Sequence, residues 1–158
     1  MARARSGGLA VGVLAALRDK GGTWFGWSGE TVAAPADRGL KQVERGKITY
    51  ALLDLTEAEY AGHYGGMANR TLWPLLHYRI DLTSFDHDWY RIYREVNRRF
   101  AEHLMQLLRP DDRVWVQDFH LIPLGHELRN PLAPIVTALQ LMTLQSRGDP
   151  SREHRVIE

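Results

Sequence analysis

The clearest pattern of apolar positions predicts an amphipathic helix over residues 86–108. Its apolar stripe recurs every three or four residues and consists of Trp89, Tyr93, Val96, Phe100, Leu104 and Leu107. Four arginines lie off the stripe, and we expect them to form a solvated face: Arg91, Arg94, Arg98 and Arg99. A shorter helix is predicted over residues 9–17, with Gly21 and Gly22 ending it.

Short apolar runs predict strands between these helices. Residues 23–29 are aromatic and β-prone, and residues 41–43 and 48–53 predict a hairpin joined by residues 44–47. Residues 110–112 are typical of a turn, and the apolar run 114–116 after it predicts a buried strand with Asp118 and His120 at its carboxyl end. Strands that alternate with helices indicate an α/β fold.

The middle of the chain combines a helix start with a break. Thr56 and Glu59 have the spacing of a capping box, and Gly65-Gly66 is expected to close the short helix that follows. Pro74 argues against a regular helix across residues 72–79. Two interpretations of this aromatic and basic segment are equally supported by the sequence. The segment either packs in the core around a proline turn or forms the wall of a pocket in which Arg79 faces an anion.

Composition narrows the function classes. The 158 residues carry a net charge of +1, which favours neither nucleic acid nor an anionic membrane as a partner. The absence of cysteine excludes disulfides and thiolate chemistry, and the histidines show no metal-ligand spacing, so we expect no metal. The apolar run 9–17 is too short to span a bilayer and is followed at once by charges. We therefore expect a cytoplasmic protein rather than a secreted one.

Four motifs, in order along the chain, resemble the trehalose 6-phosphate synthase family. They are Ser-Gly-Gly-Leu-Ala-Val-Gly at 6–12, Trp-Phe-Gly-Trp-Ser-Gly-Glu at 24–30, Leu-Trp-Pro with His-Tyr-Arg at 72–79, and Trp-Val-Gln-Asp-Phe-His-Leu-Ile-Pro at 115–123. The resemblance covers residues 6–129 and implies a first domain over 1–129. It also implies a retaining glycosyltransferase with two facing Rossmann-like domains, of the GT-B type. Such enzymes move glucose from UDP-glucose to glucose 6-phosphate in trehalose biosynthesis, with no metal or other cofactor at the reaction centre.

The same resemblance implies a set of binding residues. Gly7 and Gly8 are expected to approach the UDP-glucose donor through their backbone. Trp27, Tyr64 and Asp118 are expected to hold the sugar phosphate acceptor, and Trp73 to line its pocket. These residue types suit the task, because a carboxylate accepts hydrogen bonds from sugar hydroxyls and indole rings suit apolar sugar faces.

The chain departs from this family in two places. The family has a hydrophobic first strand that ends in an arginine before the glycine pair, whereas only residues 1–5 stand before Ser6 here. The family's second domain, which supplies the cations that stabilise the leaving diphosphate, has no counterpart. Charge stabilisation is most of what this chemistry requires. We therefore expect an incomplete Rossmann-like domain without synthase turnover by this chain alone.

From His126 the sequence resembles the H-box of a sensor histidine kinase. In that alternative His126 is the phosphoacceptor of a two-component phosphorelay, and residues 130–158 form a second, dimerisation unit. An apolar stripe at spacings of four and three predicts a long amphipathic helix and a homodimer contact through residues 124–145, and it consists of Leu128, Leu132, Ile135, Leu139 and Met142. Residues 147–150 are typical of a hairpin turn, and residues 151–158 predict the start of a return helix. A third interpretation is a non-functional chimera joined at residues 126–129. No phosphate donor is encoded in the chain, so the resemblance to trehalose 6-phosphate synthase is favoured over the phosphoacceptor alternative.

Overall fold

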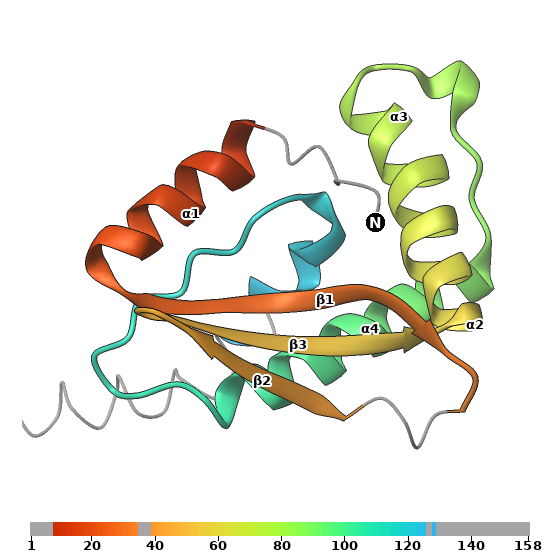
Figure 1. Cartoon of the computed structure of the whole chain (residues 1–158). Coiled ribbons are helices and arrows are strands. Elements are labelled where there is room, and N and C mark those ends of the chain that lie inside the picture. The colour runs from red at the N-terminus through yellow and green to blue at the C-terminus, as the bar shows by residue number, and fades with distance from the viewer. Residues whose placement is uncertain (1–7, 35–38, 126–127, 129–158) are drawn as a thin grey trace, which may run out of the picture.

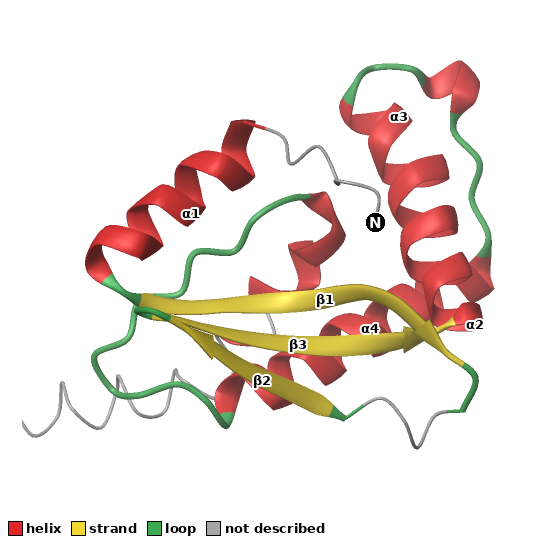
Figure 2. Cartoon of the chain, viewed as in Figure 1, coloured by secondary structure: helices red, strands yellow, loops and turns green. Residues whose placement is uncertain are grey.

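A three-stranded sheet lies at the centre of the α/β fold, as the computed structural model shows for residues 8–34, 39–125 and 128 (Figures 1 and 2). Helix α1 (Gly8–Lys20) precedes strand β1 (Gly22–Val32), and strands β2 (Leu40–Arg45) and β3 (Ile48–Thr56) follow. The strand order is β1-β3-β2. The predicted first helix and β-prone segment are both confirmed, and the glycine pair does end the helix, with Gly21 in the left-handed region at φ 82°.

The sheet combines one parallel and one antiparallel pair. Strand β1 runs parallel to β3 from Gly22 opposite Ile48 to Val32 opposite Thr56, with a shift of register between Trp27 and Thr31. Strand β2 pairs with β3 antiparallel, which confirms the predicted hairpin. Beyond Leu40, every residue of β2 is exposed, including Lys41, Glu44 and Arg45.

A continuous helical column rises from the end of β3 (Figure 1). The predicted capping box is confirmed, because the Thr56 hydroxyl accepts from the Glu59 backbone N–H at 3.2 Å and the Glu59 carboxylate accepts from the Thr56 N–H at 2.9 Å. Helix α2 (Glu57–Glu59) then runs into the π-helix η2 (Tyr60–Leu72) and helix α3 (Trp73–Leu76).

One expectation about this column is wrong. Gly65-Gly66 does not close the helix, because Gly66 serves close packing instead: a Cβ there would lie 2.5 Å from the Trp89 indole. The expectation from Pro74 is confirmed, because α3 ends at Leu76 and no regular helix extends across residues 77–79. The chain then passes through the short 3₁₀ helix η3 (Ile80–Leu82).

Helix α4 (His87–Met105) packs against the sheet and supplies half of the core. Its N-cap is Asp86, whose carboxylate accepts from two backbone N–H groups. The predicted stripe is confirmed, with Phe100 edge-on to Phe25 of β1 at 5.7 Å. Burial of each such side chain contributes about 1.5–3 kcal/mol. The buried members of this core cluster are Leu53, Leu55, Val96, Phe100, Ala101, Leu104, Leu124 and Leu128.

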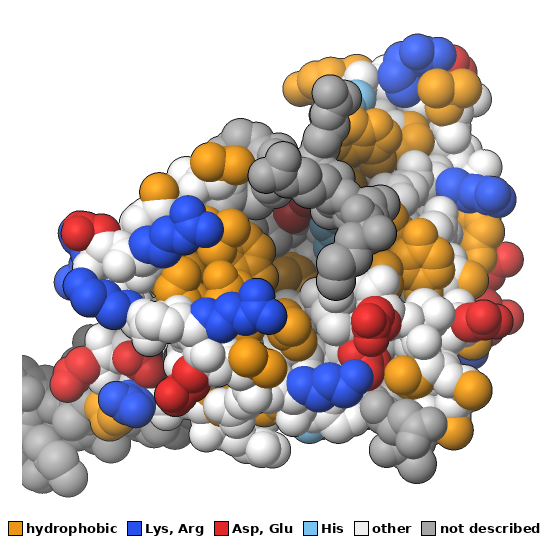
Figure 3. Space-filling model, viewed as in Figure 1, with side chains coloured by type: hydrophobic (Ala, Val, Ile, Leu, Met, Phe, Trp, Pro, Cys, Tyr) orange, Lys and Arg blue, Asp and Glu red, His pale blue; other side chains and the backbone are white. Residues whose placement is uncertain are grey.

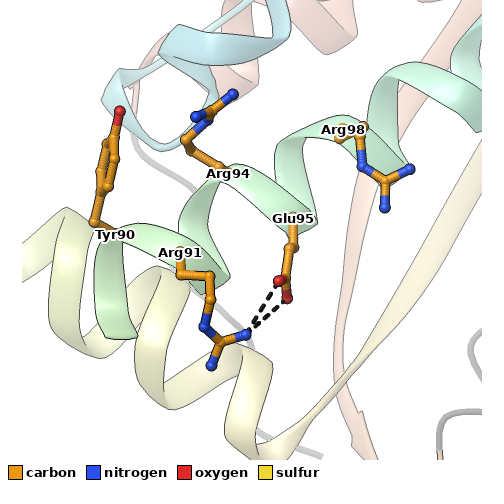
Figure 4. Close-up of a pocket in the computed structure, with 5 residues that line it drawn as sticks. All are labelled: Tyr90, Arg91, Arg94, Glu95 and Arg98. Atoms are coloured by element: carbon orange, nitrogen blue, oxygen red, sulfur yellow. Dashed lines mark hydrogen bonds and ion pairs between the residues drawn. The ribbon is translucent and has the colours of Figure 1, made fainter. Parts of the chain in front are cut away.

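The arginines of α4 divide into two groups. Arg91, Arg94 and Arg98 are exposed as expected and, with Tyr90 and Glu95, line a shallow hollow of about 320 Å³ (Figure 4). The expectation is wrong for Arg99, whose guanidinium donates to the Asp54 carbonyl at 3.2 Å and to the Glu59 carboxylate at 3.3 Å. Arg99 therefore ties α4 to the end of β3, a role that its position off the apolar stripe does not reveal.

The predicted strand at residues 114–116 is also wrong. The turn before it is present, with the Asp112 N–H bonded to the Arg109 carbonyl at 3.1 Å. The chain then continues without regular structure, and Trp115 is 72% exposed. A strand needs a neighbour to take its backbone hydrogen bonds, and no strand of the described sheet pairs with this segment.

Three side chains instead hold the turn that follows, at the 3₁₀ helix η4 (Phe119–Leu121). The Tyr93 hydroxyl donates to the Phe119 carbonyl at 2.6 Å. The His120 carbonyl accepts from the Asn97 amide and from the His63 ring Nε2, both at 3.1 Å. Burial lowers the pKa of His63 to about 4, so this ring is neutral at pH 7.

We expect Gly66→Ala to destabilise the fold by about 1–3 kcal/mol, because overpacking at this strength forces a helix or the Trp89 ring to move. The measurement is the free energy of unfolding in urea. Gly65→Ala is the matched control, since its Cβ would meet only the Tyr60 carbonyl at 3.9 Å. Equal stability of the two variants would contradict this account of the helix contact.

The His63 ring should make stability pH-dependent. Its folded pKa of about 4 lies below the unfolded value of 6.5, so the unfolded chain binds more protons between these values. The contribution is complete above about pH 6.5 and is lost as the pH falls towards 4. Between about pH 7.5 and pH 4.5, the wild type should lose on the order of 2 kcal/mol more than His63→Gln. The glutamine keeps an N–H donor for the His120 carbonyl and does not titrate. If the free energy of unfolding falls by the same amount in the wild type and in His63→Gln, the prediction is wrong.

Candidate functional site

Aromatic rings from three separate segments form a continuous path that begins at Trp27 in the middle of β1. Trp27 of β1 lies 5.2 Å from Tyr60 and 6.0 Å from Tyr64 between ring centroids, both in η2. Tyr64 stacks on Tyr60 with 5.5 Å between ring centroids. It also stacks on His120 of η4, with 4.8 Å between centroids and only 1° between the two ring planes. The path therefore joins the sheet, the helical column and the turn after α4.

The path continues from His120 to the predicted residue Trp73. The Phe119 ring lies 4.3 Å from the His120 ring and 5.4 Å from Trp73 at the start of α3. Trp73 is about half exposed and also contacts the His77 ring at 3.8 Å. A half-exposed indole offers one face to a ligand while the other side stays anchored by neighbouring rings.

Asp118 stands beside this path on a left-handed backbone, with φ 75°. One carboxylate oxygen accepts from the Phe119 N–H at 2.7 Å, and the other lies 3.3 Å from Nδ1 of His120. The side chain remains about half exposed. Left-handed backbone at a non-glycine residue is uncommon and clusters at functional sites. It is retained here because the surrounding contacts fix the turn.

Trp27 is held by polar contacts around the end of β1. Its indole N–H donates to the Glu30 carbonyl at 2.9 Å. The next residue, Ser28, donates its hydroxyl to the carboxylate of buried Asp54 at 2.6 Å, and Lys41 of β2 forms an ion pair with the same carboxylate at 2.5 Å. Hydrogen bonds from Lys41 and then Ser28 lower the pKa of Asp54. Asp54 of β3 therefore stays ionised and links β1 to β2 through Ser28 and Lys41.

The structure thus brings together four of the sequence-predicted site residues: Trp27, Tyr64, Trp73 and Asp118. Gly8 is the first residue of α1, whereas Gly7 lies outside the described residues. Arg79 donates to its neighbour Asp81 at 2.8 Å and 2.9 Å, so its guanidinium is already engaged within its own loop.

Sequence reasoning missed two members of the path, Tyr60 and Phe119, and it placed His120 beside Asp118 without a binding role. Tyr60 lies one helical turn before Tyr64, and this spacing would have placed both phenols on one face. Phe119 and His120 follow Asp118 directly, but no local pattern tells which ring faces which segment. Tertiary packing decides that contact.

Other features of the described segments carry less information about chemistry. Within them, no three acidic or histidine side chains gather into a group that could hold a metal ion. None of the helices in these segments has the length and apolar character needed to cross a bilayer. On the face shown in Figure 3, positive and negative side chains are interspersed among hydrophobic ones.

The second resemblance falls mostly outside the described residues. His126 and residues 129–158 are not described, so the phosphoacceptor site, the dimer contact and the second unit remain predictions. Of the predicted long stripe, only Leu128 is described, and it is buried in the core of the α/β fold.

Comparison with known proteins gives consistent matches. The model of glycosyltransferase family 20 matches residues 1–140, which extends past His126 and Arg129. The trehalose-6-phosphate synthase of Citrobacter koseri is 48% identical over 124 residues, covering 78% of this chain and 26% of that protein. The chain therefore spans about a quarter of the length of the curated relatives it matches. The histidine kinase alternative gains no support from these matches.

Solved structures agree with the sequence matches. An α,α-trehalose-phosphate synthase of Burkholderia xenovorans in complex with glucose-6-phosphate is 44% identical with a TM-score of 0.76, covering 82% of this chain and 28% of that one. An Escherichia coli structure bound with UDP-2-fluoro glucose is 44% identical with a TM-score of 0.73, covering 83% and 29%. The fold, the motifs and the matched residues together show that the chain belongs to glycosyltransferase family 20.

Proposed function

We propose that this chain carries the acceptor-binding part of a trehalose-6-phosphate synthase and that its ligand is glucose 6-phosphate. In this proposal Trp27, Tyr64 and Asp118 hold the sugar phosphate, and Trp73 lines the pocket. The donor is UDP-glucose, approached through the backbone of Gly7 and Gly8. The reaction of the longer relatives would then be glucose transfer from UDP-glucose to glucose 6-phosphate.

One observation carries the proposal: a half-exposed carboxylate stands beside a path of stacked and tilted ring contacts that joins three chain segments. Asp118 lies 3.3 Å from His120, which stacks on Tyr64 at 4.8 Å, and Tyr64 lies 6.0 Å from Trp27. Trp27, Tyr64 and the turn that carries Asp118 and His120 are separated by tens of residues in the sequence, so their meeting is a property of the fold rather than of a local motif.

The chemistry of the cluster suits a sugar phosphate. The Asp118 carboxylate accepts hydrogen bonds from sugar hydroxyls, and the Tyr64 hydroxyl donates to a phosphate oxygen. Indole rings pack on the apolar face of a pyranose. The Burkholderia xenovorans relative was solved with glucose-6-phosphate and the Escherichia coli relative with UDP-2-fluoro glucose, which supports both ligand assignments.

Titration of the chain with glucose 6-phosphate tests the proposal. In nuclear magnetic resonance spectra we expect the indole signals of Trp27 and Trp73 to shift in a saturable way. Asp118→Asn should weaken binding about tenfold or more, because hydrogen bonds to a charged group contribute about 1.5–3 kcal/mol.

Asp111→Asn is the matched control, since Asp111 is an exposed carboxylate in the preceding turn and has no part in the proposed pocket. Its affinity should equal that of the wild type. If glucose 6-phosphate shifts neither indole signal at millimolar concentration, or if both aspartate variants weaken binding equally, the acceptor assignment is wrong.

A further inference from the structure

We propose that His120 is a positioning residue: its ring fixes the direction of the Asp118 carboxylate and the plane of Tyr64 at the same time. This inference rests on the proposed function, because those two side chains are the polar groups assigned to the acceptor. His120 itself need not touch the sugar phosphate. Its role is to hold two binding groups at a set spacing before the ligand arrives.

The contacts of Asp118 show how its direction is set. One oxygen is held by the Phe119 N–H at 2.7 Å and the other lies 3.3 Å from Nδ1 of His120. The hydrogen bond to one oxygen and the ring nitrogen close to the other together set the plane of the carboxylate. About half of the side chain stays exposed, so further lone pairs of the oxygens remain open to a ligand.

The contact with Tyr64 depends on the flat face of the His120 ring rather than on its nitrogen atoms. The His120 imidazole lies parallel to the phenol within 1° at 4.8 Å. Tyr64 is also stacked on Tyr60 and lies near Trp27. Removal of the imidazole would leave the phenol supported on the η2 and β1 sides only, free to tilt towards the space that His120 had filled.

The backbone of His120 is itself fixed, so the ring has a firm base. Its carbonyl accepts from His63 of η2 and from Asn97 of α4, both at 3.1 Å. The side chain is 19% exposed. The residue is therefore anchored to two helices by its backbone and to two binding groups by its ring.

The protonation state of His120 suits this role. Burial lowers the pKa of His120 more than the neighbouring Asp118 carboxylate raises it, so the ring is neutral at pH 7. A neutral imidazole carries one N–H, and in this proposal it lies on Nδ1, the ring nitrogen 3.3 Å from the Asp118 carboxylate. The donor thus orients the carboxylate without cancelling its negative charge, which stays available for sugar hydroxyls. A lysine or arginine at this position would compete for that charge.

Three substitutions separate the donor from the ring. His120→Asn carries an amide N–H near the position of Nδ1, His120→Gln carries one near that of Nε2, and His120→Phe keeps a stacking ring without any donor. We expect the asparagine variant, which keeps the donor but loses the ring, and the phenylalanine variant, which keeps the ring but loses the donor, each to bind glucose 6-phosphate about threefold more weakly than the wild type. The glutamine variant loses both features and should lose about tenfold, equivalent to about 1.4 kcal/mol. His87→Phe, at an exposed histidine of α4, is the control and should bind as the wild type does.

A second measurement does not need the ligand. Nitrogen-15 spectra of the imidazole should show a neutral ring at pH 7 with the proton on Nδ1, and Asp118→Asn should move the Nδ1 signal. The free energy of unfolding in urea, measured for each variant, identifies any substitution that weakens binding only because it destabilises the fold.

The outcomes separate this inference from the proposed function. A wild type that binds no glucose 6-phosphate, with the proton on Nδ1 and sensitive to Asp118→Asn, defeats the acceptor assignment and leaves the His120–Asp118 coupling standing. A proton on Nε2, or equal affinities of the asparagine and glutamine variants, overturns the positioning role even when glucose 6-phosphate binds.

Discussion

The arrangement of the candidate site depends on two backbone carbonyls at the turn after α4. The Phe119 carbonyl accepts from Tyr93, and the His120 carbonyl accepts from both His63 and Asn97. An unpaired buried donor or acceptor costs about 1–3 kcal/mol, so each of these bonds favours one backbone path. No strand of the described sheet pairs with the turn, and these side chains supply the constraint that a strand would otherwise receive from its neighbours.

The close approach of η2 and α4 makes these bonds possible. Gly62 and Gly66 leave room for Ile92 and Trp89 where any larger residue would collide, and the two helices can then both reach the turn. The same helix η2 carries Tyr60 and Tyr64 towards Trp27 of β1. A packing requirement at two glycines is thus connected, through helix distance, to the spacing of the rings that we assign to the acceptor.

The sequence alone predicts the features of the fold that depend on contacts between residues close together in the chain. The capping box at Thr56 and the stripe of α4 depend on contacts within a few residues, and both are present. The prediction of a strand at residues 114–116 was wrong because a strand forms only where a neighbouring strand takes its backbone hydrogen bonds. The prediction for Gly66 was wrong because its packing partner, Trp89, lies on another helix. The site residues came from a family resemblance, and the rings that link them, Tyr60, Phe119 and His120, are brought together by tertiary packing.

The charged edge strand has a consequence for how the sheet can grow. Beyond Leu40, all of β2 faces solvent and bears Lys41, Glu44 and Arg45. Charges along an edge, lysine above all, discourage another chain from pairing there and so protect against aggregation. Strand β1, the other edge of the described sheet, carries aromatic and glycine residues and one charged residue, Glu30, so its protection is weaker. Any extension of this sheet is therefore directed to the side of β1.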